Sequence, residues 1–201
     1  MNTEEIIKLE GEAILNMPKD NPYYSAALLI YDIVHVKGGR VIISGMGKAG
    51  QIALNIATTL SSTGTPAIFL HPADAQHGDI GVIRAEDILI IVSNSGKTRE
   101  IIELCYSVLN LHSHIPLILI TGNLNTELRG RALYVLWTGN PPEACPFGMT
   151  PTTSTTVIGV IGDIIVNLMM DMITFTREEY YKRHHGGYIG NKLNHKLKKN
   201  G

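Results

Sequence analysis

Three hydroxyl side chains, a glycine and a lysine follow an apolar run in the stretch SNSGKT (residues 93–98). Side chains this polar need water or a ligand to satisfy their hydrogen-bonding groups. Ser93, Ser95 and Thr98 lie where a strand is expected to end and a helix to begin, and backbone N–H groups at such a point attract anions. Lys97 adds positive charge. One hydroxyl suffices for an ordinary helix cap, so the pattern favours a phosphate-binding corner.

A second polar loop, SGMGKAG (44–50), places Gly45, Gly47 and Gly50 at the G-x-G-x-x-G spacing of dinucleotide-binding loops. The acidic residue that should hold a ribose about twenty positions further on is missing, and so is the Walker spacing. Lys48 stands at the start of the following helix, where the helix dipole disfavours a cation. Lys48 is therefore either a solvated surface lysine or a site residue. In the second case an anion or a developing negative charge would offset the unfavourable interaction with the helix dipole.

Two further loops carry groups suited to proton transfer. HPADAQHGDIG (71–81) contains two histidines and two aspartates, whose spacing is not a diagnostic zinc signature. His77 is therefore expected either to be a hydrogen-bonded active-site residue or to support the loop. PPEACPFGMTPTTSTT (141–156) holds Glu143 beside a proline pair, which indicates a carboxylate in a rigid turn. A pair of histidines in RHHGGYIG (183–190) is polar enough for a site but is also compatible with a solvated surface.

Composition limits the class of protein. The chain has 201 residues, of which 44% are hydrophobic and 17% charged, and its formal net charge of -1 argues against a general nucleic-acid binder. The basic tail KLNHKLKKNG (192–201) is expected to be a solvated end. Cys105 and Cys145 fit neither a disulfide framework nor a metal-binding spacing, which favours a reducing cytoplasm. The acidic N-terminus is unlike a signal peptide, and apolar runs such as DILIIV are too short to span a bilayer.

The elements that position these loops alternate along the chain. Strands are predicted at 40–44, 66–70, 87–92, 115–121 and 133–137. Helices are predicted at 2–17, 22–36, 48–62, 97–111, 154–173 and 176–182. The strands are continuous Ile-, Val- and Leu-rich runs, which is typical of a parallel sheet covered by helices on both faces. The sequence thus predicts one doubly wound α/β domain of about five strands, with its ligand at the carboxyl ends of the strands.

Taken together, the motifs resemble the sugar isomerase (SIS) domain family. SNSGKT is similar to the S-x-S-x-x-T phosphate motif of that family, and GMGKAG, HGDIG, EACPFGMTPTTSTT and HHGGYIG resemble the arabinose-5-phosphate isomerases. The resemblance runs from about Gly39 to Leu193. It implies one SIS domain with a flavodoxin-like three-layer sandwich, in which 1–38 form leading helices, 39–137 the α/β core and 138–201 the active-site loop, long helix and C-terminal segment.

The resemblance also implies an activity. The arabinose-5-phosphate isomerases interconvert D-ribulose 5-phosphate and D-arabinose 5-phosphate without a cofactor. This reaction is the first step towards the sugar acid Kdo of lipopolysaccharide and capsule. The implied catalytic residues are Lys48, Glu100, Glu143 and His184. The implied substrate- and phosphate-binding residues are Ser44, Gly47, His77, Ser93, Asn94, Ser95, Lys97 and Thr98. No metal is required, although zinc bound at His77 would inhibit.

For the chemistry we expect Glu143 to be the base that moves a proton between C1 and C2, with its turn raising the pKa by desolvation. Lys48 would stabilise the enediolate oxygen. His184 would assist ring opening and, as in a homotetrameric family, reach the site of a neighbouring subunit. Glu100 and His77 would orient Lys48 or hold sugar hydroxyls.

Three positions depart from the family pattern, which commonly has Glu at Lys97, Pro at His185 and Ser at Ala49. No CBS regulatory pair follows the domain in this sequence, so we expect a stand-alone form to sense a downstream nucleotide sugar, CMP-Kdo, in the same pocket. Two alternatives remain. One is a non-catalytic sugar-phosphate-binding regulatory SIS protein, although 1–38 show no basic DNA-binding face. The other is an isomerase of another ketose phosphate. The E-A-C-P and H-G-D stretches favour an arabinose-5-phosphate isomerase over this second alternative.

Overall fold

The fold is built around a five-stranded parallel sheet in the order β2-β1-β3-β4-β5. The computed structural model describes residues 1–185, so the basic tail and most of the HHGGYIG motif lie outside the described residues. The strands are β1 (Val41–Gly45), β2 (Ala67–Phe69), β3 (Ile88–Val92), β4 (Leu117–Thr121) and β5 (Tyr134–Trp137). All four pairings are parallel. The predicted sheet is confirmed.

The central strands β1, β3 and β4 are buried along their whole length. Successive side chains of a strand point to opposite faces of the sheet. Ile43 and Ile90 accordingly belong to the hydrophobic core on one face, and Ile42 and Leu89 to the core on the other. Because both faces are covered, these strands are continuous apolar runs with no polar alternation.

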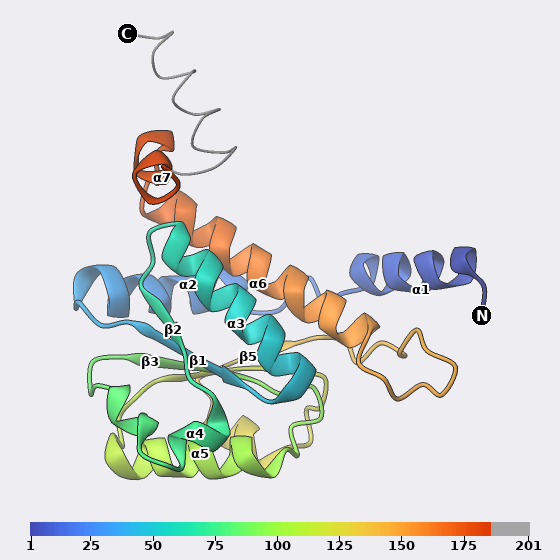
Figure 1. Ribbon diagram of the computed structural model, residues 1–201, viewed down its shortest axis with the longest axis horizontal. Coiled ribbons are helices and arrows are strands. Elements are labelled where there is room, and N and C mark those ends of the chain that lie inside the picture. Colours follow the sequence, from blue (N-terminus) through green and yellow to red (C-terminus); the bar gives the residue numbers. More distant parts are fainter. Residues whose placement is uncertain (186–201) are drawn as a thin grey trace, which may run out of the picture.

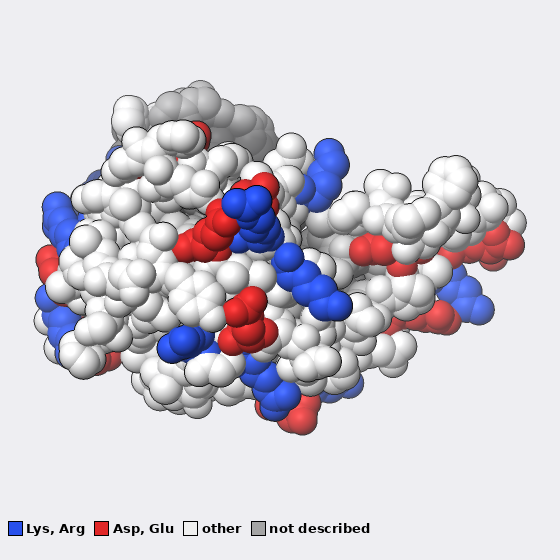
Figure 2. All heavy atoms as spheres, turned by 90° about the horizontal axis from the view of Figure 1, so that it is seen from below, with Lys and Arg blue, Asp and Glu red and all other residues white. Residues whose placement is uncertain are grey.

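Helices cover both faces, which makes a three-layer sandwich (Figure 1). One layer contains α2 (Tyr23–Tyr31) with its π-helical extension η1 (Asp32–Val36), α3 (Gly47–Ser62) and α6 (Thr153–Met172). The opposite layer contains the short α4 (Pro72–Ala75) and the long α5 (Arg99–Leu111), together with the 3-10 turns η2 (Asp79–Val82) and η3 (Glu127–Arg131). Figure 2 shows the face on the α5 side, where basic and acidic side chains are interspersed.

The first helix, α1 (Thr3–Leu15), extends away from the body beside the start of α6 (Figure 1). A capping box between Asn2 and Glu5 fixes its N-terminus. None of its residues is fully buried, and Ile7 and Leu15 are 67% and 73% exposed. The helix predicted over 2–17 is therefore present, but it is held to the body by one face only.

The long helix α6 has 20 residues and contains an 18-residue segment with a mean hydropathy of 1.5, which by length and composition is enough to cross a bilayer. The expectation that apolar runs are too short to do so is thus wrong for this helix. Half of this segment is buried inside the protein. Ile158, Ile161 and Ile165 pack in the core on the face of the sheet that α2 and α3 also cover, and this packing accounts for the apolar composition. The short α7 (Arg177–Arg183) follows it.

Candidate active site

A cavity of about 270 Å³ opens at the carboxyl edge of the sheet, above β1 and β3. The strand order reverses between these two strands, and ligands of doubly wound folds bind at such a switch point. The residues that position its walls come from the starts of α3, α5 and α6 and from the loop before α6. Six of the predicted site residues line it, namely Lys48, Ser93, Asn94, Ser95, Thr98 and Glu143.

The wall formed by 93–98 has free hydroxyl groups. Ser93 is 3% exposed, and its hydroxyl has no hydrogen-bond partner among the described residues. Thr98 is the N-cap residue of α5, yet its side chain makes no capping hydrogen bond. Gly96 has a φ of +62°, and a Cβ there would lie 2.7 Å from Thr126. The capping alternative therefore does not explain these hydroxyls, which remain available to an anion at the start of α5.

The opposite wall carries Glu143, which caps the N-terminus of α6. Its Oε2 accepts hydrogen bonds from the backbone N–H of Thr152 at 2.8 Å and of Ser154 at 3.1 Å, and from the Thr152 hydroxyl at 3.2 Å. Burial raises the pKa of Glu143, but these hydrogen bonds and the Ser154 hydroxyl outweigh it, so the pKa lies below the ordinary value. The expectation of a raised pKa is wrong, because the turn supplies donors as well as desolvation.

Hydrogen bonds to sulfur shape the loop between Glu143 and α6. The Sγ atom of Cys145 accepts the backbone N–H groups of Met149 and Thr150, both at 3.2 Å. The Thr150 N–H, against the opposing effect of desolvation and with help from Met149, lowers the pKa of Cys145 to about 7. Cys145 thus organises the loop that presents Glu143, a role that the sequence pattern did not indicate.

Lys48 stands in the first turn of α3, on the rim of the cavity, and is exposed. No salt bridge pairs it with an acidic residue in the described part of the chain. The neighbouring Gly47 adopts a φ of +59°, and a Cβ there would meet no atom within 4 Å. An unpaired ammonium at a helix N-terminus makes this rim attractive to a negatively charged oxygen.

A wider cavity of about 750 Å³ adjoins the first and shares Asn94, Ser95 and Glu143 with it. Lys97 lines this second cavity rather than the first, together with Asn123. The Asn123 side chain donates to the Ser95 carbonyl oxygen at 2.7 Å. The two cavities together offer more room than the 93–98 corner alone.

The comparisons with known proteins agree with this geometry. The model of the SIS domain matches residues 34–168, about two thirds of the chain. The chain belongs to the SIS domain family. The resemblance drawn from the motifs is therefore confirmed.

Its relatives include the arabinose 5-phosphate isomerase KdsD of Pseudomonas aeruginosa, 43% identical over 77% of this chain and 47% of that protein. KdsD of Salmonella typhi is 41% identical over 94% of this chain and 57% of its own length. This chain thus spans about half the length of the curated relatives it matches.

Two solved structures are similar over nearly all of the chain. A Bacteroides fragilis protein, whose name assigns it to phosphosugar isomerisation in capsule formation, has a TM-score of 0.90 and 53% identity, covering 92% of this chain and 96% of its own. An Escherichia coli CFT073 protein in complex with arabinose 5-phosphate has a TM-score of 0.80 and 31% identity, covering 92% and 100%. The SIS-type fold is confirmed.

Several predicted site residues of the SIS domain lie away from the cavity. The buried Ser44 hydroxyl donates to the carbonyl oxygen of Leu70 at 2.6 Å, so it is occupied within the fold. Gly47 lines a separate cavity of about 260 Å³ with Gly50 and His71. His77 is exposed beyond α4. Within residues 1–185, no group of three or more His, Cys, Asp and Glu side chains is placed to hold a metal.

Glu100 and His184 are also separate from the cavity within one chain. Glu100 lies in the first turn of α5 and is half-buried, but it is not among the lining residues. His184 follows α7, where its ring stacks on Tyr180 with centroids 4.0 Å apart and its Nδ1 lies 3.0 Å from the Tyr180 carbonyl oxygen. The cavity is at the other end of α6, and a 20-residue helix is about 30 Å long.

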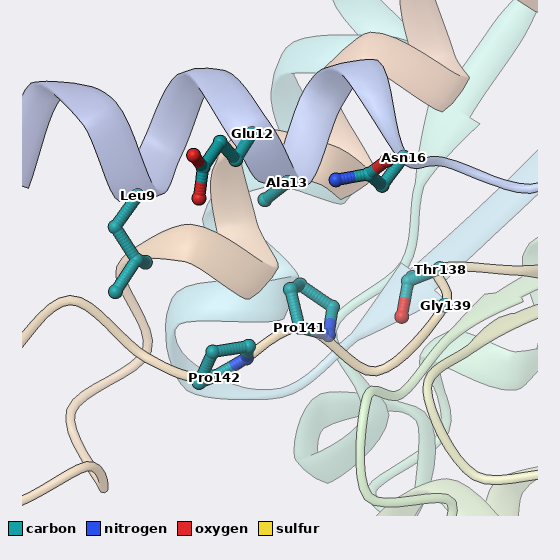
Figure 3. A pocket seen from close by; sticks show the side chains of 8 residues that line it. All are labelled: Leu9, Glu12, Ala13, Asn16, Thr138, Gly139, Pro141 and Pro142. Atoms are coloured by element: carbon teal, nitrogen blue, oxygen red, sulfur yellow. The ribbon is translucent and has the colours of Figure 1, made fainter.

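A smaller cavity of about 210 Å³ separates α1 from the loop that leads to Glu143 (Figure 3). Leu9 and Glu12 of α1 point towards it from one side, and Pro141 and Pro142 form the other. Pro141 and Pro142 directly precede Glu143 in the sequence, so α1 is adjacent to the segment that positions Glu143.

Proposed function

We propose that this SIS domain is a phosphosugar aldose–ketose isomerase that interconverts D-ribulose 5-phosphate and D-arabinose 5-phosphate through an enediol(ate). The observation that carries the proposal is a single cavity with unoccupied hydroxyls, including the buried Ser93 hydroxyl, on one wall and an ionised Glu143 on the other. The names of the relatives and the arabinose 5-phosphate bound to the E. coli protein support it.

The phosphate would bind in the corner formed by 93–98. Backbone N–H groups at the start of α5 and the hydroxyls of Ser93, Ser95 and Thr98 supply donors, while Asn94 and the nearby Lys97 lie beside them. Binding the phosphate there directs the carbonyl end of the open-chain sugar across the cavity. Its C1 and C2 would then face Glu143.

Glu143 would act as the base that removes a proton from one of these carbons and returns it to the other. Its three backbone and hydroxyl contacts from Thr152 and Ser154 all end on Oε2, which leaves Oε1 for the substrate. A carboxylate with a lowered pKa is a weak base, so the site must also make the carbon acid stronger. Lys48 and the N-terminus of α3 would do this by stabilising the enediolate oxygen.

The residues far from the cavity fit a site shared between subunits. We propose a homotetramer in which His184 of one subunit reaches the cavity of another and assists ring opening and proton transfer between O1 and O2. Glu100 and His77 would take supporting roles, orienting Lys48 or holding sugar hydroxyls. A zinc ion bound at His77 would be inhibitory. The proposal requires no nucleic acid, membrane or cofactor, and it places the reaction in the cytoplasm.

The test is to incubate the purified protein with D-ribulose 5-phosphate and a panel of other ketose phosphates and to measure aldose product. Formation of D-arabinose 5-phosphate at the highest kcat/KM in the panel supports the proposal. Preference for a hexulose or sedoheptulose phosphate would replace the substrate but keep the reaction. Tight binding of a sugar phosphate with no product would indicate a regulatory SIS protein instead.

We also propose that CMP-Kdo, a nucleotide sugar downstream of this reaction, inhibits the enzyme. The adjoining 750 Å³ cavity, with Lys97 on its wall, has room for a ligand larger than a pentose phosphate. Titrating CMP-Kdo into the isomerase assay tests this. Competitive inhibition that Lys97→Ala weakens would support it, and no inhibition at any soluble concentration would refute it.

A further inference from the structure

The helix α1 has one side-chain hydrogen bond to the rest of the described chain, and it is made by an acidic residue. Oε1 of Glu10 accepts the hydroxyl of Thr153 at 3.1 Å, across 143 positions of sequence. Thr153 is fully buried in the first turn of α6. The carboxylate therefore reaches the same helix end that Glu143 caps.

The Thr153 hydroxyl also forms a hydrogen bond with the active-site loop. Its oxygen accepts the backbone N–H of Ala144 at 3.0 Å, and the Thr152 hydroxyl accepts the same N–H at 2.9 Å. A hydroxyl has one proton to donate. When Thr153 donates it to Glu10, its lone pairs are left for Ala144, which directly follows Glu143 in sequence.

Glu10 is half-buried, and the surroundings of its carboxylate indicate that the contact is specific. Its second carboxyl oxygen, Oε2, is buried and has no hydrogen-bond partner among the described residues. Burying such an oxygen is unfavourable, and an apolar side chain would pack α1 on α6 without that cost. The hydrogen bond to Thr153 and the positive end of the α6 dipole are the two features that favour a carboxylate here.

We propose that Glu10 is a positioning residue for Glu143. It orients the Thr153 hydroxyl, which fixes the Ala144 backbone and so the direction of the neighbouring carboxylate. A base must be aligned with the C–H bond that it breaks, so a loosened loop lowers kcat more than it raises KM. This inference rests on the proposed function for its effect on turnover, but the structural linkage does not depend on the reaction.

The first test measures the linkage without substrate, by hydrogen exchange of the Ala144 amide. Glu10→Ala is expected to accelerate this exchange about 5-fold or more, because one acceptor of the amide is no longer held in place. Glu10→Gln keeps an Oε1 acceptor and should stay within about 2-fold of the parent protein. Glu4→Ala is the matched control, since Glu4 is exposed on the same helix and does not line the cavity between α1 and the loop. Unchanged exchange in Glu10→Ala, or equal acceleration in Glu10→Gln, overturns the inference.

The second test measures kinetics well below the melting temperature of each variant. Glu10→Ala should lower kcat about tenfold with KM within about 2-fold, whereas Glu10→Gln and Glu4→Ala retain kcat. Thr153→Val should have a similar effect, and adding Glu10→Ala to it should cost little more, because both changes break one chain of contacts. Additive losses, or a KM effect without a kcat effect, would contradict positioning.

The two tests separate this inference from the proposed function. A parent protein that isomerises no ketose phosphate but shows the expected exchange pattern would end the proposed function and keep the linkage. An active parent whose Glu10→Ala variant has normal exchange and normal kcat would do the reverse.

Discussion

The carboxylate of Glu143 lies 2.8 Å from the backbone nitrogen of Thr152 and 3.2 Å from its hydroxyl. The same side chain therefore caps α6 and faces the cavity. The capping hydrogen bonds hold the carboxylate in a fixed position, because α6 itself packs in the hydrophobic core. This double role decides how a substitution at Glu143 should behave.

Glu143→Gln is expected to lower turnover by at least ~100-fold, the usual scale for a general base. The glutamine oxygen can still accept the N–H groups of Thr152 and Ser154, so substrate binding and folding should persist. Steady-state kinetics together with calorimetric binding of substrate measure the two effects. Near-normal turnover would contradict the role of Glu143 as the base.

The pH dependence follows from the lowered pKa of Glu143. Because its pKa in the folded protein lies below the ordinary value of 4.5, its ionised form stabilises the fold above that value, and this stability is lost as pH falls through the lower folded pKa. The difference in melting temperature between the parent protein and Glu143→Gln should therefore be largest near neutral pH and shrink on acidification. A difference in melting temperature that stays constant or grows on acidification would contradict the lowered pKa of Glu143.

Ser93 and Ser44 form a matched pair of buried serines at the ends of neighbouring strands. Ser93→Ala removes a hydroxyl that has no partner in the described chain, so stability should hold while KM for the sugar phosphate rises about 10-fold. Ser44→Ala leaves the Leu70 carbonyl without its donor and should cost about 1–3 kcal/mol of stability with KM unchanged. Chemical denaturation and kinetics on both variants check the pair. The opposite assignment of effects would show that Ser44, rather than Ser93, contacts the phosphate.

Cys145 and Cys105 should differ strongly in reactivity. Burial raises the pKa of Cys105 to about 11, whereas the loop lowers that of Cys145 to about 7. Only the thiolate is nucleophilic, so iodoacetamide should alkylate Cys145 at least about 100-fold faster at neutral pH. The rate should rise with pH and level off above about 7. Mass spectrometry of the timed reaction reads out each site, and equal rates in the folded protein would contradict the loop geometry.

His184 should act only across a subunit interface. His184→Ala and Glu143→Gln are each expected to be nearly inactive as pure proteins. If the two variants are unfolded together and reassembled in equal amounts, about a quarter of the sites will combine an intact Glu143 with an intact His184 from a neighbour. Activity should recover to that fraction. No recovery in a mixture that demonstrably reassembles would place His184 outside the site.

The sequence determined the sheet and the position of the cavity. Continuous Ile- and Val-rich strands such as Ile88–Val92 require two covered faces, and parallel strands bring their carboxyl ends to one edge. Ser93 and Thr98 are placed by this local geometry alone, because they directly follow a strand and precede a helix. The short α4, η2 and η3 were not predicted, since one-turn elements rest on local turn hydrogen bonds and leave no apolar period in the sequence.

Which polar atoms meet was decided only by the tertiary structure. Ser44 and Ser93 have the same chemistry and the same strand-end position, but a neighbouring carbonyl oxygen occupies only the first. The lowered pKa of Glu143 depends on the fold of its own turn against α6. The contact of Glu10 with Thr153 spans 143 positions. Hydrophobic periodicity encodes which face of an element is buried, whereas a hydrogen bond depends on where two distant segments come to lie within a fraction of an ångström.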